Sequence, residues 1–266
     1  MTSAGLAELV DLDRYPIDRP GSAEFDDLCA RCRRELDEHG VSILDRFVTD
    51  TALHRLVAES ARHATLGHAS DVVGTPYLEA PADTWPDGHP RLARGHTRLT
   101  AVAYDLFEPD AVLRRLYESD ALLDFLTASL GFPVHRYDDP LGGLNLAAMY
   151  EGDELYWHFD QTDFVVSLAV QSSTTGGDFE CVQDARTPDD ERYDRIAALL
   201  AGDHDDVVTL PMQPGTLMLF EGRRSIHRVS PIGGSTPRFV GLFGYDRKPG
   251  TRSSELLQTI RYGRTA

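Results

Sequence analysis

The sequence is poor in cysteine, and it has neither a long apolar run nor a basic N-terminus. Only three cysteines occur in 266 residues. Cys29 and Cys32 form a C-x-x-C inside a helical pattern, whereas a zinc site needs four ligands and a redox pair usually opens a helix after a strand. We therefore expect reduced thiols. No stretch reaches the ~18 apolar residues of a membrane span, and no signal peptide pattern begins the chain, which predicts a cytoplasmic protein.

Positive charge is also scarce, because 26 Lys and Arg stand against 43 Asp and Glu, for a net charge of −17. Such a field repels nucleic acids and anionic membranes, so we expect neither as a partner. The composition, with 41% hydrophobic and 26% charged residues, is typical of a soluble globular protein. A small molecule is the expected partner, and no oligomeric state is predicted.

Periodicity divides the chain into a helical first part and a strand-rich second part. The spacing predicts a strand over 41–48 and helices over 22–39, 50–64, 108–119 and 121–131. Residues 65–96 are rich in Gly, Pro, His and Asp and are expected to form a long loop, our candidate lid.

From Val134 onward, short strands alternate with turn residues, and one helix interrupts them at 191–202. This pattern is typical of a closed barrel or jelly roll. The predicted fold class is α+β, a jelly-roll core with flanking N-terminal helices. No repeat or linker splits the chain, so we expect a single domain over 1–266. Within it, 1–132 would be mainly helical support and lid, 133–250 the β core and 251–266 a C-terminal tail.

A candidate metal site begins at the sequence LYWHFDQTD. His158 and Asp160 are two residues apart, so on one strand their side chains would share a face. His227, after the apolar strand TLMLF, is the candidate third ligand. Two imidazoles and one carboxylate form the set that leaves adjacent metal positions open for other ligands. The alternative is a satisfied polar pair without a metal.

Arg238 stands eleven positions after His227, at the start of an otherwise apolar strand. A guanidinium facing the interior there is costly unless a ligand carboxylate meets it. The alternative is an ion pair with one of the many acidic residues.

These residues resemble the Fe(II)- and 2-oxoglutarate-dependent oxygenases, especially the prolyl-hydroxylase-like branch, over most of residues 134–246. The segments around the HFD and IHRVSP motifs are similar to bacterial enzymes that halogenate or hydroxylate free amino acids in biosynthesis. The motifs that carry the resemblance are His158-x-Asp160, Gly176-Gly177-Asp178-Phe179, Pro214-Gly215-Thr216-Leu217-Met218-Leu219-Phe220, His227-Arg228-Val229 and Arg238.

The resemblance implies a double-stranded β-helix that holds Fe(II) through His158, Asp160 and His227. It also implies that 2-oxoglutarate binds the iron and that Arg238 grips its far carboxylate. Relatives often have Arg-x-Ser where this chain has Arg238-Phe239-Val240, so a second anchor must lie elsewhere.

Four further side chains have possible roles in ligand binding. Asn145 and Ser167, each on the more polar face of its strand, are the candidates for the second 2-oxoglutarate anchor. Arg98, just after the candidate lid, is a candidate clamp for a substrate carboxylate. Gln161, beside the metal ligands, is a candidate substrate contact. Each has a plain structural alternative.

The resemblance implies a dioxygenase that uses O₂ on a small polar metabolite, such as a free amino acid or a derivative of one. Halogenating relatives have Gly or Ala in place of the H-x-D carboxylate, and halide takes the vacant position. Because Asp160 is present, we expect a hydroxylase. The alternatives are a desaturase, cyclase or halogenase of the same superfamily, a cupin-like binding module without redox chemistry, and a zinc hydrolase.

Overall fold

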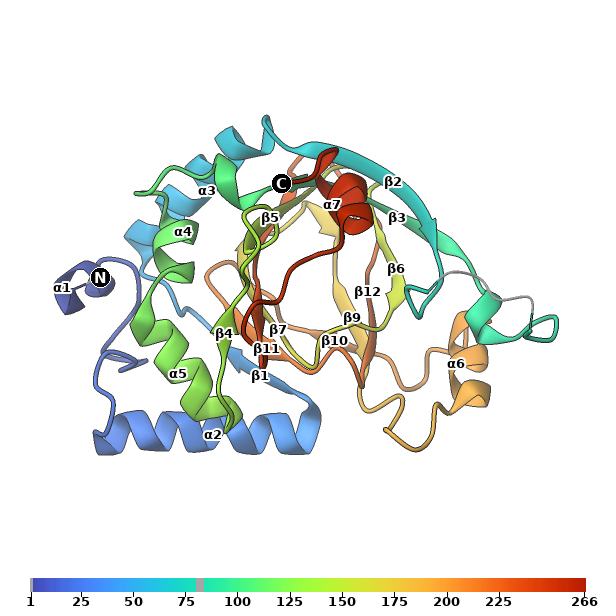
Figure 1. Ribbon diagram of the computed structural model, residues 1–266, viewed down its shortest axis with the longest axis horizontal. Helices are drawn as coiled ribbons and strands as arrows, with labels where there is room; N and C mark the ends of the chain where they lie inside the picture. The colour runs from blue at the N-terminus through green and yellow to red at the C-terminus, as the bar shows by residue number, and fades with distance from the viewer. Residues whose placement is uncertain (1, 80–83) are drawn as a thin grey trace.

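The computed structural model describes residues 2–79 and 84–266. Most of the helices gather on one side of a seven-stranded sheet, and a four-stranded sheet lies on its other side (Figure 1). The helices are α1 Ser3–Ala7, α2 Ala23–His39, α3 Asp50–Ala64, α4 Val112–Tyr117, α5 Asp120–Leu130, α6 Tyr193–Leu200 and α7 Glu255–Tyr262, with short 3-10 turns at η1 Pro90–Leu92 and η2 Tyr104–Leu106.

The two main sheets are antiparallel, and their strands follow one another in space in a different order from the sequence. The large sheet runs in the order β1 Val41–Leu44, β11 Leu217–Phe220, β7 Val165–Gln171, β14 Arg238–Phe243, β5 Leu144–Met149, β3 Gly95–Val102 and β2 His68–Gly74. The small sheet runs in the order β10 Val208–Leu210, β9 Phe179–Val182, β12 Ile226–Val229 and β6 Leu155–His158. Two short pairs complete the fold, β13 Ile232–Gly233 with β8 Thr175–Gly176 and β15 Tyr245–Asp246 with β4 His135–Arg136.

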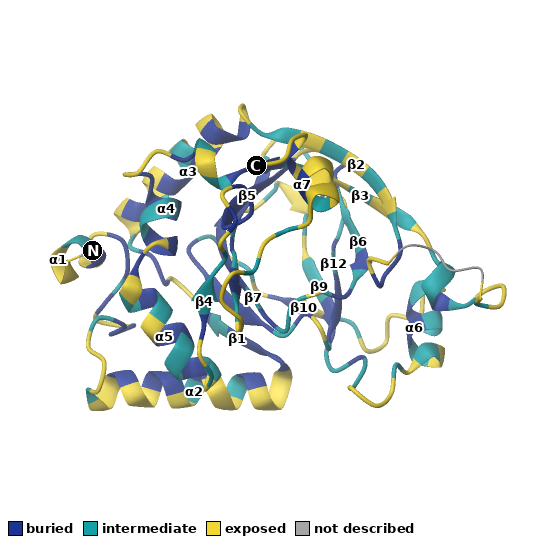
Figure 2. Cartoon of the chain, in the orientation of Figure 1, coloured by how far each residue is buried: buried dark blue, intermediate teal, exposed yellow. Residues whose placement is uncertain are grey.

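Alternation along the central strands separates the helix-covered face of the large sheet from the face toward the small sheet. On β7, Val166, Leu168 and Val170 join the main hydrophobic core with the helices. The intervening Ser167 and Ala169 therefore point to the space between the two sheets, which we call the inter-sheet space. Burial is nearly continuous along these strands, while the outer faces of the helices are exposed (Figure 2).

The covering helices are defined by local signals that the sequence carries. Ser22 caps α2 by accepting a hydrogen bond from the amide of Phe25, and Gly40 ends the helix at φ 67°. The buried side of α2 includes Phe25, which packs edge-on against Phe125 of α5. The helices predicted over 22–39 and 50–64 thus form α2 and α3 almost to the residue.

The expectation of a long loop over 65–96 is wrong for part of that range. β2 and the start of β3 lie within it and form an antiparallel ribbon at the edge of the large sheet. Residues 80–83, which lay inside the predicted lid, fall outside the described residues. The division of the chain at 132/133 stays a prediction, although three strands before it join the large sheet.

The C-terminal segment 251–266 is also more than a tail, because it contains α7. Ser254 caps this helix by accepting from the amide of Leu257, and Gly263 ends it at φ 68°. None of the helices in the described part of the chain has the length and apolar character needed to span a bilayer. All three cysteines are free and buried.

Candidate metal centre

The structure brings His158, Asp160 and His227 together, and each can offer one ligand atom to a common point. The candidate ligand atoms of the three side chains all lie within 4.8 Å of one another. Nε2 of His158 is 3.8 Å from Oδ1 of Asp160, and Nε2 of His227 is 3.6 Å from Oδ2. Cross-strand pairing explains the contact between the two imidazoles, because His227 of β12 lies directly opposite His158 of β6.

The backbone fixes which ring nitrogen of each histidine faces the site. Nδ1 of His158 is 2.8 Å from the carbonyl oxygen of Tyr156, and Nδ1 of His227 is 3.0 Å from that of Ser225. A carbonyl only accepts, so each Nδ1 carries the proton and each Nε2 presents a lone pair. Such outer hydrogen bonds are typical of metal-binding histidines.

Electrostatics keep the His158 imidazole neutral, as a metal ligand requires. Burial lowers the pKa of His158 to about 4, and His227 acts in the same direction while Asp160 opposes it. The carboxylate is also short of partners, since its buried Oδ2 accepts no hydrogen bond from any described residue. Two aligned nitrogen lone pairs beside an unsatisfied carboxylate oxygen fit a divalent transition metal such as iron.

Asp160 reaches the site for a different reason from the one the sequence pattern suggested. β6 ends at His158, so Asp160 lies in the irregular segment that follows and not on the strand. Its amide donates to the carbonyl of Gly222, at 3.0 Å, and its carboxylate lies directly against that glycine. A Cβ on Gly222 would be only 1.7 Å from Oδ2 of Asp160. The β11–β12 connection therefore forms a socket for the carboxylate.

Arg238 lies in the inter-sheet space, as predicted, and has no acidic partner. The residue is 7% exposed, and its closest polar contact is Nη1 to the sulfur of Met149, at 3.9 Å. No described carboxylate comes within ion-pair distance. Burial lowers the pKa of Arg238 to about 10, with only a partial electrostatic offset from Asp178. An isolated buried guanidinium is costly, and the carboxylate of a ligand would offset that cost.

A cavity of about 310 Å³ opens in front of this guanidinium. Arg238 and Val240 of β14, Ala169 and Gln171 of β7, and the turn 172–178 contribute to its wall. Phe179, which also lines it, stacks on the ring of His227 with 5.3 Å between ring centroids. One aromatic side chain thus contacts both the cavity beside Arg238 and the ring of a metal ligand candidate.

The two candidates for a second anchor do not line this cavity. Ser167 and Asn145 both face the inter-sheet space and both pair in register with Leu242, four residues along β14 from Arg238. Asn145 is 7% exposed, and its side-chain amide has no hydrogen-bond partner among the described residues. The Ser167 hydroxyl is buried without a partner. Gln171, which the sequence analysis missed, lies next to Arg238 but donates to the carbonyl of Pro237.

The two substrate candidates also have partners of their own. Arg98 pairs with Asp71, its cross-strand neighbour, at 3.3 Å, and its side chain is 46% exposed. Its chain neighbours Thr97 and Leu99 face the other way, toward Tyr156 and the core, so Arg98 points outward. The structure does not bring Arg98 to the metal ligands. Gln161 lies beside them but donates to the carbonyl of Leu78, at 3.4 Å.

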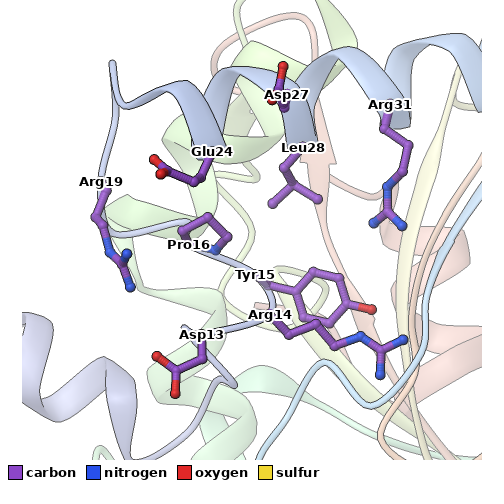
Figure 3. A pocket seen from close by; sticks show the side chains of 9 residues that line it. All are labelled: Asp13, Arg14, Tyr15, Pro16, Arg19, Glu24, Asp27, Leu28 and Arg31. Atoms are coloured by element: carbon purple, nitrogen blue, oxygen red, sulfur yellow. The ribbon is translucent and has the colours of Figure 1, made fainter.

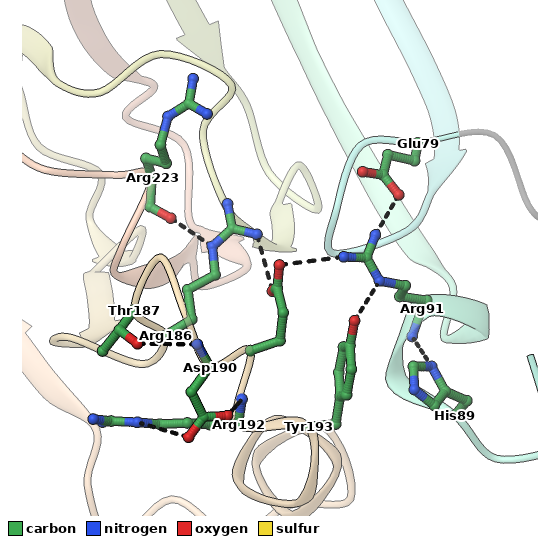
Figure 4. A network of polar contacts seen from close by, with 10 residues as sticks. Glu79, His89, Arg91, Arg186, Thr187, Asp190, Arg192, Tyr193 and Arg223 are labelled. Atoms are coloured by element: carbon green, nitrogen blue, oxygen red, sulfur yellow. Dashed lines mark hydrogen bonds and ion pairs between the residues drawn. The ribbon is translucent and has the colours of Figure 1, made fainter.

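The chain between β2 and β3 is tied to α6 by a polar network (Figure 4). Arg91 pairs with Glu79 and with Glu191, at 3.3 Å to the latter, and donates to the hydroxyl of Tyr193 at 2.9 Å. Its guanidinium also lies 4.3 Å from the ring centre of Tyr77. Gln161 contacts this connection at Leu78, so part of the predicted lid, residues 65–96, borders the site.

A second cavity, of about 380 Å³, lies away from this chemistry between the N-terminal segment and α2 (Figure 3). It contains none of the candidate site residues. Two of its arginines are engaged within the chain, since Arg14 pairs with Asp45 at 2.6 Å and Arg19 donates to the carbonyl of Leu12 at 3.1 Å. We assign it no function.

Comparisons with known proteins agree with this geometry. SnoK, described as a non-heme alpha-ketoglutarate-dependent carbocyclase from nogalamycin biosynthesis, is 15% identical with a TM-score of 0.58, over 91% of this chain and 94% of that one. SnoN, an epimerase from the same biosynthesis whose structure has been determined with Fe³⁺ and alpha-ketoglutarate, is 14% identical with a TM-score of 0.55, over 83% and 84%. A Pseudomonas putida prolyl-4-hydroxylase is 16% identical with a TM-score of 0.51, over 83% and 99%. The expected resemblance to 2-oxoglutarate oxygenases is confirmed in the fold.

Sequence comparison adds a family. No curated protein matches the chain by sequence. The model of the halogenase D family matches residues 94–258, which include the metal ligand candidates, Arg238 and the first half of α7. This match spans more than half of the chain, and the chain therefore belongs to the halogenase D family.

Proposed function

We propose that this protein is an Fe(II)- and 2-oxoglutarate-dependent hydroxylase of a small polar metabolite, such as a free amino acid. One observation carries the proposal. The His158, Asp160 and His227 triad shares the inter-sheet space with Arg238, a buried arginine that has no acidic partner. The two sheets would be the halves of a double-stranded β-helix. We propose a cytoplasmic, biosynthetic role, as the sequence suggested.

The three ligand side chains would occupy one side of the iron and leave adjacent positions for 2-oxoglutarate and O₂. When bound, iron and 2-oxoglutarate supply the oxidation: O₂, 2-oxoglutarate and a substrate C–H become succinate, CO₂ and a C–OH. The protein supplies position and shielding. Phe179 and Phe220 pack on His227, with ring centroids at 5.3 and 4.9 Å, and hold that ring in place.

Arg238 would bind the far carboxylate of 2-oxoglutarate in the 310 Å³ cavity. A guanidinium matches a carboxylate with two parallel hydrogen bonds, and the burial of Arg238 makes that contact stronger than it would be in water. No other buried cation borders this cavity among the described residues. Asn145 and Ser167, which both pair in register with Leu242 of β14, remain the proposed second anchors for 2-oxoglutarate.

Halogenation is the second candidate, because the family is described as halogenase D. The carboxylate of Asp160 argues against it in this chain. A carboxylate neutralises one charge of the metal and fills the position that a halide would need. The socket at Gly222 supports the same view, since the fold reserves space for the carboxylate.

The test is incubation of the iron-loaded protein with 2-oxoglutarate, O₂ and a panel of free amino acids, with and without high chloride. We expect substrate-dependent succinate and a product that has gained one oxygen atom. Loss of two hydrogens would indicate a desaturase or cyclase, and a chlorinated product would overturn the hydroxylase assignment. Absence of succinate with every substrate would favour a cupin-like binding module or a zinc hydrolase.

A further inference from the structure

The backbone between His158 and Asp160 is held from two sides. The amide of Phe159 donates to the carbonyl of Pro76 at 2.8 Å, and the amide of Asp160 donates to that of Gly222 at 3.0 Å. The Phe159 side chain is 1% exposed and packs in a hydrophobic cluster on the side of the small sheet that faces away from the metal ligand candidates. Contacts to Phe159 and to the loop at Gly222 therefore bear on where the Asp160 carboxylate lies.

Arg186, between β9 and α6, contacts both of these segments. Its guanidinium carbon lies 4.1 Å from the ring centre of Phe159, within the range of a cation–π contact. Its Nε donates to the carbonyl of Arg223, the residue after Gly222, at 2.7 Å (Figure 4). One side chain thus joins the aromatic residue between two metal ligand candidates to the loop that forms the socket for Asp160.

Arg186 is itself fixed in position. Its side chain is 17% exposed, and its Nη1 pairs with Glu191 at 3.2 Å. Its backbone amide donates to the carbonyl of Arg224 at 3.2 Å, so the segment around Arg186 follows the socket loop. A planar guanidinium can stack on a ring and donate hydrogen bonds in its own plane at the same time, which the ammonium of a lysine cannot do. The position therefore uses the properties that distinguish arginine from lysine.

We propose that Arg186 is a positioning residue of the metal site, which keeps the carboxylate of Asp160 directed at the two histidines. It acts through Phe159 on one side and through the socket loop on the other. Side chains of a metal site must be held within about 0.5 Å of their working geometry, so a small shift of this loop is enough to weaken the site. The inference rests on the metal site of the proposed function.

The experiment measures metal binding without turnover. Iron(II) affinity is determined under nitrogen by chelator competition, and cobalt(II) serves as a second probe, because its visible absorption bands report the coordination geometry. We expect Arg186→Gln to weaken iron(II) binding by about 10-fold, the lower end of the effect of a lost supporting contact at a metal site. The cobalt(II) spectrum should change with it. Arg186→Lys should recover part of the affinity and of the spectrum.

Arg114 of α4 provides the matched control, because it makes the same kinds of contact in another part of the fold. Its guanidinium carbon lies 5.1 Å from the ring centre of Tyr104, its Nη1 donates to the carbonyl of Phe107 at 2.9 Å, and its Nε pairs with Glu118 at 2.8 Å. Arg114→Gln should lower the melting temperature of the metal-free protein, as Arg186→Gln does, but bind iron(II) and cobalt(II) like the wild type.

The outcomes separate the inference from the proposed function. In an Asp160→Ala background, Arg186→Gln should cause little further loss of metal. Wild-type affinity and spectrum in Arg186→Gln, or an equal loss in Arg114→Gln or in the Asp160→Ala background, would overturn the inference alone. Failure of the wild type to bind either metal would overturn the metal site as well. If Arg186→Gln does not fold in EDTA, Glu191→Gln takes its place, since it removes the carboxylate partner of Arg186, and it should show a smaller loss of the same kind.

Discussion

Substitution of Gly222 by alanine tests whether the socket under Asp160 controls the metal site. The added Cβ would lie 1.7 Å from Oδ2, 2.6 Å from Cγ and 3.0 Å from Cβ of Asp160. Nonbonded atoms need about 3.5 Å, so the carboxylate would have to move by roughly 1.5–2 Å. Metal–ligand distances tolerate only about 0.2 Å of change. Asp160 cannot move this far and remain a ligand.

We expect Gly222→Ala to weaken iron(II) binding by about 10–100-fold, the usual effect of a lost supporting contact at a metal site. The backbone itself should accept alanine, because Gly222 does not have the left-handed φ that favours glycine. Gly74→Ala is the matched control, since Gly74 has an ordinary φ and an added Cβ there meets nothing within 4 Å. Iron affinity is measured by chelator competition, and folding by thermal denaturation in EDTA.

A double-mutant cycle separates the socket from general damage. If Gly222 acts through Asp160, adding Gly222→Ala to Asp160→Ala should cause little further loss of iron. Wild-type iron affinity in the single Gly222→Ala variant would refute the reasoning, because the carboxylate would then be dispensable or free to rotate away. An equally large loss in both backgrounds would indicate damage unrelated to Asp160.

Three further outcomes follow from the site. Arg238→Ala should weaken 2-oxoglutarate binding by about 10–100-fold while iron binding stays near normal, and unchanged affinity would disprove its role. Arg195→Ala, at a half-buried arginine that pairs with Asp206, is the control. His227→Ala should lose stoichiometric iron, measured by metal analysis after dialysis. Metal-free protein should lose stability as the pH falls from 6.5 toward about 4, because the unfolded chain then protonates His158 while the folded chain resists. His158→Gln should flatten this part of a plot of melting temperature against pH.

The sequence predicted the centre of the site better than its edges. His158, His227 and Arg238 lie where strand patterns placed them, because alternation along a buried strand fixes the side that each residue faces. Asp160 was expected to share a strand face with His158, but it lies in the segment after β6 and is brought to the histidines by its contact with Gly222, which sequence spacing cannot reveal.

The sequence analysis missed β2 and α7 for identifiable physical reasons. β2 alternates half-buried and exposed residues and pairs on one side only, so its sequence HASDVVG lacks the apolar run of a central strand. α7 did carry signals that went unread, Ser254 followed by Glu255 at its start and Gly263 at its end.

The charge distribution bears on how so acidic a protein would bind a dicarboxylate such as 2-oxoglutarate. A net charge of −17 opposes the approach of a carboxylate, so binding would depend on local contacts and not on long-range attraction. The buried Arg238 meets this need, because it has no acidic partner among the described residues and Asp178 offsets its desolvation only in part. An unpaired guanidinium in the inter-sheet space would therefore hold a carboxylate that reaches it, and the surrounding negative field would discourage anions that it cannot hold.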